Sequence, residues 1–131
     1  MSLTEKEIIS LLKQTQKEAL ALYSNFRVAA VLLTADEDVF TGINIESSSY
    51  GLTICAERVA MFKALSEGER DFRKIYILAD MKTPCPPCGA CRQILMDFAP
   101  DIEVVMVAAN DSILRMTLKE LLPHAFDGSQ L

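Results

Sequence analysis

Hydrophobic positions near the start of the chain recur at the spacing of an α-helix. They are Ile8, Leu11, Leu12, Ala19 and Leu22. Thr4 followed by Glu7 has the form of a capping box, an arrangement that marks a helix start. The periodicity and the cap together predict an amphipathic first helix that begins after Thr4 and ends near Leu22.

Apolar runs rich in β-forming residues follow this helix. Residues 26–33 and 39–45 flank the acidic stretch 36–38. Because apolar runs separated by a short polar segment are typical of a β-hairpin, we expect antiparallel strands here. Residues 74–79 and 103–108 have the composition of two further buried strands.

The segments between and after these strands favour helices. Residues 55–67 are rich in Ala, Met, Lys and Leu, and Gly68 would end that helix. Prolines interrupt the chain before a helix that starts at Cys88, and residues 117–122 form a short helix that Pro123 stops. Strands alternating with helices after an initial hairpin indicate an α/β sandwich with a mixed sheet, whose later strands are parallel.

Length and charge narrow the range of functions. Half of the 131 residues are hydrophobic, so we expect a single domain, 1–131, with a buried core. A formal charge of −5 disfavours a nucleic-acid polymer as partner but permits an uncharged nucleoside as substrate. No apolar run reaches the roughly 20 residues of a membrane span, and the segment 1–10 is charged rather than signal-like. We therefore expect a cytoplasmic protein that does not bind membranes.

The cysteines carry the strongest chemical signal. Cys55 and Glu57 form C-x-E, and Cys88 and Cys91 belong to a later P-C-x-x-C. In a reducing compartment such clustering indicates metal binding or catalysis rather than disulfides. Two thiolates at one helix start and a third at another can hold one zinc ion and leave its fourth position open, as in catalytic zinc sites.

Two neighbours of Cys55 suit an open zinc site. Zinc lowers the pKa of a bound water to about 7, and hydrolytic deamination also needs a group that moves protons. Glu57 is the candidate for that role, because C-x-E with P-C-x-x-C is the pattern of zinc-dependent deaminases. Three thiolates leave the zinc site with net negative charge, so we expect Arg58 to donate hydrogen bonds to a ligand sulfur and offset that charge.

Several ordered segments extend this pattern along the chain. They are YSNFRV at 23–28, GINIE at 42–46, SYGLTICAER at 49–58, PCGACRQ at 87–93 and ELLP at 120–123, before Phe126. In these segments the chain resembles the small, three-cysteine class of cytidine deaminases, over nearly its whole length. The resemblance implies a three-layer α/β/α sandwich with a mixed sheet of about five strands, and one Zn²⁺ per chain.

The same resemblance implies a reaction and partners. The reaction is hydrolytic deamination of free cytidine and deoxycytidine to uridine and deoxyuridine, with release of ammonia, in pyrimidine salvage. The family acts as homotetramers in which neighbouring subunits complete each active site. The implied substrate-binding residues are Phe26, which packs against the nucleoside; Asn44 and Glu46, which bind ribose hydroxyls; Ala56, whose backbone amide binds the pyrimidine carbonyl; and, from neighbouring chains, Tyr50 and Phe126.

Other interpretations of these residues remain open. All four cysteines, Cys85 included, could form a closed structural zinc site, and the C-x-x-C pair alone could be a redox dithiol. Otherwise Cys85 is a free, partly buried thiol. The chain could also be a zinc-binding scaffold without catalysis, or a deaminase of another cytosine-bearing compound such as blasticidin S. Taken singly, Glu57, Asn44 and Glu46 would be ordinary helix or turn residues, and Phe26 a core residue.

Overall fold

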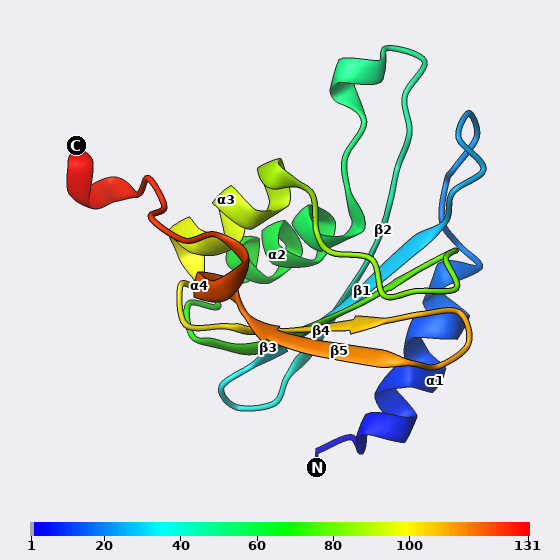
Figure 1. The fold of residues 1–131 in the computed structure, drawn as a ribbon, viewed down its shortest axis with the longest axis horizontal. Helices are drawn as coiled ribbons and strands as arrows, with labels where there is room; N and C mark the ends of the chain where they lie inside the picture. Colours follow the sequence, from blue (N-terminus) through cyan, green and yellow to red (C-terminus); the bar gives the residue numbers. More distant parts are fainter. Residues whose placement is uncertain (1) are drawn as a thin grey trace.

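A five-stranded sheet lies at the centre of the computed structural model, which describes residues 2–131 (Figure 1). Its strands are β1 (Val28–Thr34), β2 (Val39–Ile43), β3 (Phe72–Ala79), β4 (Glu103–Val107) and β5 (Ile113–Thr117). They lie in the order β2-β1-β3-β4-β5. β3 and β4 are parallel and the other neighbours antiparallel, so the sheet is mixed, as expected. The segment 1–10, which we expected to be charged rather than signal-like, begins with Met1. Met1 lies outside the described residues.

Helices cover both faces of this sheet. The α-helices are α1 (Glu5–Gln16), α2 (Ala56–Ser66), α3 (Gly89–Phe98) and α4 (Leu118–Leu121), and two short 3₁₀ segments are η1 (Tyr50–Leu52) and η2 (Gly128–Gln130). α1 packs on one face, and α2 and α3 on the other, which gives the expected α/β/α sandwich (Figure 1). Within residues 2–131 no helix has the length and apolar character that a membrane crossing requires.

The side chains of the central strands alternate between the two helical layers. On β1, Ala29 and Val31 pack in the cluster that includes α1, whereas Ala30 and Leu32 pack with α2 and α3. A strand that is covered on both faces buries successive side chains in opposite directions, so all of them are apolar. This explains the unbroken apolar run from Val28 to Leu33.

The capping box that the sequence predicts at the start of the first helix is present, and the structure adds another. At α1 the Glu7 amide donates to Thr4 Oγ1 at 3.2 Å, and the Thr4 amide donates to Glu7 Oε1 at 3.0 Å. Thr117 and Glu120 form a second box at the start of α4. Because the partners of a capping box are only three residues apart, the sequence is enough to predict it.

The predicted end of the first helix near Leu22 is wrong, because α1 ends at Gln16. Beyond it, Leu20 forms an isolated β-bridge with Ile45, and the Leu20 amide donates to the Asn44 carbonyl at 2.9 Å. Leu22 itself is 72% exposed. Pairing with a distant segment, rather than helical periodicity, therefore decides the conformation after Gln16.

Strand β5 is the element that the sequence analysis did not identify. It pairs with β4 at the edge of the sheet, with Arg115 opposite Val105. Because Leu114 and Arg115 are exposed, the strand lacks the continuous apolar run of the buried strands. The remaining predicted strands and helices are present, with ends shifted by about two residues or fewer.

Gly42 is the point at which β2 and α2 come closest. A Cβ at this position would lie 2.2 Å from the Ala56 carbonyl oxygen and 2.7 Å from the Ala60 amide nitrogen. Both obstacles are backbone atoms, which cannot rotate away as a side chain can. Gly42 therefore sets how near the start of α2, with Cys55 and Glu57, lies to the sheet.

Replacing Gly42 by Ala should push α2 away from β2 and lower the free energy of unfolding by about 1–3 kcal/mol. Gly128→Ala is the matched control, because a Cβ at Gly128 meets no atom within 4 Å. Urea denaturation of both variants and the wild type measures the difference. Equal midpoints for Gly42→Ala and the wild type would show that this contact does not constrain α2.

Candidate active site

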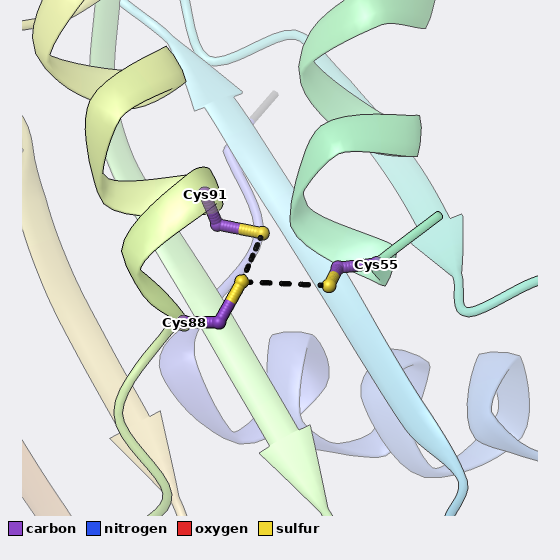
Figure 2. Close-up of side chains that lie close together, drawn as sticks. All are labelled: Cys55, Cys88 and Cys91. Atoms are coloured by element: carbon purple, nitrogen blue, oxygen red, sulfur yellow. Dashed lines mark hydrogen bonds between the residues drawn. The ribbon is translucent and has the colours of Figure 1, made fainter. Parts of the chain in front are cut away.

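Three cysteine sulfurs meet at the starts of two helices (Figure 2). Cys55 is the N-cap residue of α2, Cys88 is the N-cap residue of α3, and Cys91 lies in the first turn of α3. The Sγ atoms of Cys55 and Cys88 are 3.6 Å apart, and those of Cys88 and Cys91 are 3.5 Å apart. Residues that are separated by more than thirty positions in the sequence thus form one cluster of potential ligands.

The N-cap position leaves the sulfurs available to an ion. Cys55 and Cys88 have extended backbone conformations, and neither side chain makes the hydrogen bond that usually caps a helix. The free N–H groups at a helix start also carry partial positive charge. Two helix starts therefore reduce the electrostatic cost of gathering negatively charged thiolates.

The distances and the donor type fit zinc. With Zn–S bonds of about 2.3 Å, tetrahedral coordination separates two sulfurs by roughly 3.8 Å, close to the spacing found here. Thiolate sulfur is a ligand type that zinc prefers. Cys85 lies outside the three-sulfur group, and its thiol donates to the Pro86 carbonyl at 3.6 Å. The closed four-cysteine site is therefore not formed, and Cys85 is a free, half-buried thiol as expected.

The cluster already favours a thiolate at Cys55. Hydrogen bonds to its sulfur from Cys91, and then from Arg58 and Cys88, lower the pKa of the Cys55 thiol to about 5. The same contact, together with burial and the charge of Glu57, raises the pKa of the Cys91 thiol. A bound metal cation would release the remaining protons, since only the thiolate is a ligand.

Arg58 lies one helical turn after Cys55. Its Nη2 donates to Cys55 Sγ at 3.5 Å, and this contact raises the pKa of the guanidinium. A cation that is hydrogen-bonded to a ligand sulfur offsets part of the negative charge of three thiolates. The geometry is the one that we expected for Arg58, whose effect on catalysis stays a prediction.

Glu57 is a buried carboxyl group beside this cluster. Only 5% of its surface is exposed, and burial, reinforced by the charge of Cys55, raises its pKa to about 7. A carboxyl group with a pKa near neutrality can both accept and donate a proton under physiological conditions. Such a group next to a metal site is suited to general acid–base chemistry.

A cavity of about 190 Å³ opens beside the sulfurs. The predicted site residues that line it are Phe26, Asn44, Cys55, Ala56, Glu57 and Cys88. Sequence reasoning missed Thr53 and Pro86, and also Ile77 and Ala79 at the end of β3. It considered Cys85 as a thiol but did not place it on the wall of this cavity. The β3 residues have no motif, because their place in the cavity follows from the position of β3 in the sheet.

A second hollow, of about 390 Å³, adjoins the first. Glu46 and Tyr50 line it with Tyr23 and Ser24, and Thr53 lines both hollows. The rings of Tyr23 and Tyr50 meet edge to face, with centroids 5.9 Å apart. The predicted ribose-binding residue Glu46 thus lies next to the metal cavity rather than inside it.

Phe126 is not brought to the metal cavity of its own chain. It is 58% exposed and lies beside α3, where Gln93 Nε2 donates to its carbonyl oxygen at 2.8 Å. Tyr50 is also largely exposed, at 74%. Within one chain these two predicted residues are therefore separate from the sulfurs, and their contribution to a neighbouring subunit stays a prediction.

The arrangement defines a class of protein. Three cysteine ligands would leave a fourth coordination position of a zinc ion open, and a buried carboxyl group beside them can move protons. Together with the α/β/α sandwich, these features define a zinc-dependent hydrolytic enzyme.

Comparison with known proteins identifies the family. The family described as "cytidine and deoxycytidylate deaminase zinc-binding region" matches residues 3–109. A cytidine deaminase from Halalkalibacterium halodurans is 48% identical over 119 residues, 90% of each chain. A probable cytidine deaminase from Dictyostelium discoideum is 44% identical over 96% of this chain and 86% of its own length. The crystal structure of cytidine deaminase from Burkholderia pseudomallei has a TM-score of 0.91 at 41% identity, covering 95% of this chain and 100% of the other. The chain belongs to the cytidine and deoxycytidylate deaminase family.

Substitution of the cysteines should separate ligands from non-ligands. We expect one zinc per chain in the wild type and in Cys85→Ala, because Cys85 lies outside the sulfur cluster. Cys55→Ala, Cys88→Ala and Cys91→Ala should each lose most of the metal, because two sulfurs cannot hold zinc as three do. Metal analysis after dialysis measures the content. Loss of zinc from Cys85→Ala alone, with the other three variants loaded, would overturn the ligand assignment.

Proposed function

We propose that the protein catalyses the hydrolytic deamination of free cytidine and deoxycytidine to uridine and deoxyuridine, with release of ammonia. The observation that carries this proposal is the presence of Cys55, Cys88 and Glu57 on the wall of one cavity, in a chain of the deaminase family. The substrate is neutral, which agrees with a protein of net charge −5 that has no need to attract phosphates. We place the reaction in pyrimidine salvage in the cytoplasm, where reducing conditions keep thiolates available.

Cys55, Cys88 and Cys91 hold one zinc ion in this proposal. When bound, zinc supplies the Lewis acidity that makes water a nucleophile at neutral pH. The three thiolates need compensation if the metal is to remain an effective Lewis acid, and the hydrogen bond from Arg58 and the two helix starts provide it.

Glu57 moves the protons. Its carboxylate accepts a proton from the attacking water and passes it to N3 of the pyrimidine. Protonation of N3 makes C4 more electrophilic. The second proton of the water then reaches the amino group at C4, through the same carboxyl group, so that ammonia leaves and a carbonyl forms. The pKa of Glu57, raised to about 7, suits a group that both accepts and donates protons, since neither protonation state is strongly favoured.

The two adjoining hollows suit the two parts of a nucleoside. The pyrimidine would occupy the smaller cavity, where Phe26 packs against it and the Ala56 amide, which has no intrahelical acceptor at a helix start, meets its carbonyl oxygen. The sugar would extend toward the second hollow, with Asn44 and Glu46 binding its hydroxyls. Because Thr53 lines both hollows, a nucleoside can place its base in the first hollow and its sugar toward the second.

The purified, zinc-loaded protein should change the ultraviolet spectrum of cytidine as uridine forms. Glu57→Gln should keep its zinc and its fold but lose on the order of 10²–10⁴-fold in kcat, because the amide cannot move the protons. Ammonia release measured in parallel confirms the chemistry. A zinc-loaded wild type that leaves cytidine unchanged would indicate a scaffold without catalysis, and turnover of blasticidin S alone would indicate the other deaminase specificity.

We also propose that the chain, acting as a single domain, assembles into a homotetramer with shared active sites. The segment between β2 and α2 projects from the body of the molecule, with η1 at its tip (Figure 1). Tyr50 and Leu52 in η1 are 74% and 73% exposed. Exposed apolar side chains on a projecting segment favour burial against another subunit. Tyr50, and Phe126 near the C-terminus, would then approach the nucleoside bound to a neighbour.

Light scattering should give a mass of four times the 14.5 kDa chain. Leu52→Glu should lower the mass, because a carboxylate would be buried in the subunit contact. Leu3→Glu is the matched control, since Leu3 is also exposed but lies near the N-terminus, at the opposite end of the molecule (Figure 1). A wild type that is monomeric at assay concentration, and active, would contradict shared sites.

A further inference from the structure

The loop before β1 is hydrogen-bonded to the segment that follows β2. Leu20 bridges Ile45 through the backbone, with the Glu46 amide donating to the Leu20 carbonyl at 3.0 Å. Asn44 continues the connection with its side chain, which donates to the Phe26 carbonyl at 2.8 Å and accepts from the Val28 amide at 3.0 Å. The proposed nucleoside-binding residues Phe26, Asn44 and Glu46 therefore belong to one connected unit.

The Glu46 carboxylate is oriented by two consecutive residues of this loop. Its Oε1 accepts from the amides of Tyr23 and Ser24 at 2.8 and 2.9 Å. Its Oε2 accepts from the Ser24 hydroxyl. These donors, the Ser24 hydroxyl first, hold the pKa of Glu46 below its usual range, so the carboxylate is ionised. A carboxylate has roughly four acceptor positions, so one remains for a ligand hydroxyl.

The Ser24 hydroxyl is fixed from its other side as well. The Phe26 amide donates to Ser24 Oγ at 3.0 Å. Because a hydroxyl has a single proton, an oxygen that accepts from Phe26 and donates to Glu46 has a defined orientation. Ser24 thus connects the residue proposed to pack on the base with the residue proposed to bind the sugar.

The rest of the loop does not need Ser24 to keep its shape. Asp80 Oδ2 accepts from the Arg27 amide at 3.3 Å, and Gln16 Nε2 donates to the Arg27 carbonyl at 3.0 Å. Together with the Asn44 contacts, these bonds hold residues 26–28 independently of the Ser24 side chain. Removal of that hydroxyl also takes the acceptor from the Phe26 amide, but this contact is exposed and water can replace it. The main effect should therefore fall on the Glu46 carboxylate rather than on the fold.

We propose that Ser24 is a positioning residue for nucleoside recognition, which holds the Glu46 carboxylate where its free acceptor position meets a ribose hydroxyl. The inference rests on the proposed function and extends it to a residue that touches neither the metal cluster nor Glu57. Ser24 acts on binding of the sugar, and the proton transfers proceed without it. Its effect should therefore fall on KM.

Steady-state kinetics with cytidine tests this role. Ser24→Ala should raise KM on the order of tenfold and change kcat by less than about twofold, because a charge-assisted hydrogen bond to the carboxylate is lost. Ser24→Thr restores the hydroxyl and should return KM to near the wild-type value. Ser66→Ala is the control for loss of an exposed serine hydroxyl, since Ser66 bonds only within its own helix end.

A double-mutant cycle identifies the route of the effect. In a Glu46→Ala background, Ser24→Ala should change KM by less than about twofold, because the carboxylate that it orients is gone. Thermal melting of each variant separates loss of positioning from loss of fold. An unchanged KM in Ser24→Ala, or an equal rise in KM with and without Glu46, would overturn the proposal. Absence of cytidine turnover in the wild type would instead overturn the proposed function.

Discussion

The meeting of three cysteine sulfurs and a buried carboxyl group at the starts of α2 and α3, beside the central strands β1 and β3, is the constraint on which the rest of the structure depends. Ionised sulfurs and a buried carboxylate repel one another, and burial adds a desolvation cost. Two helix starts and the Arg58 guanidinium offset that cost, and a divalent cation would offset it further. The backbone contributes as well, because the close approach at Gly42 fixes how near the start of α2 lies to the sheet.

Recognition and chemistry are assigned to different parts of the fold. The metal cluster and Glu57 lie on helix starts, which are rigid and supply partial positive charge. Apart from the Ala56 amide at the start of α2, the proposed contacts to the nucleoside within one chain lie on loops that are connected to one another by the side chains of Asn44 and Glu46. A residue such as Glu46 thus has a structural role in the free protein and an unused acceptor position for a ligand. A recognition surface built in this way is preorganised, which reduces the entropy lost on binding.

The sequence was most informative where a function needs residue types at fixed short spacings. The C-x-E and P-C-x-x-C patterns and the resemblance placed the sulfurs and Glu57 in one site, and the structure brings these residues together. Ile77 and Ala79 escaped detection, because an apolar residue at the end of a strand looks the same whether it lines a cavity or a core. Ser24 lay within a recognised segment, yet its contact with Glu46 joins positions 22 residues apart and has no local signature.

The amino-acid sequence by itself determined the helix starts, the hairpin, the buried strands and the identity of the metal-binding side chains. The secondary-structure elements depend on periodicity or on hydrogen bonds between residues a few positions apart, and the metal-binding side chains were identified by residue types at fixed short spacings. Only the tertiary structure decided that α1 ends at Gln16, that β5 pairs at the sheet edge, and that the 190 Å³ cavity adjoins a second hollow. The physical reason is that these features arise from contacts between distant segments, whose partners are chosen by chain closure and packing rather than by local conformational preference.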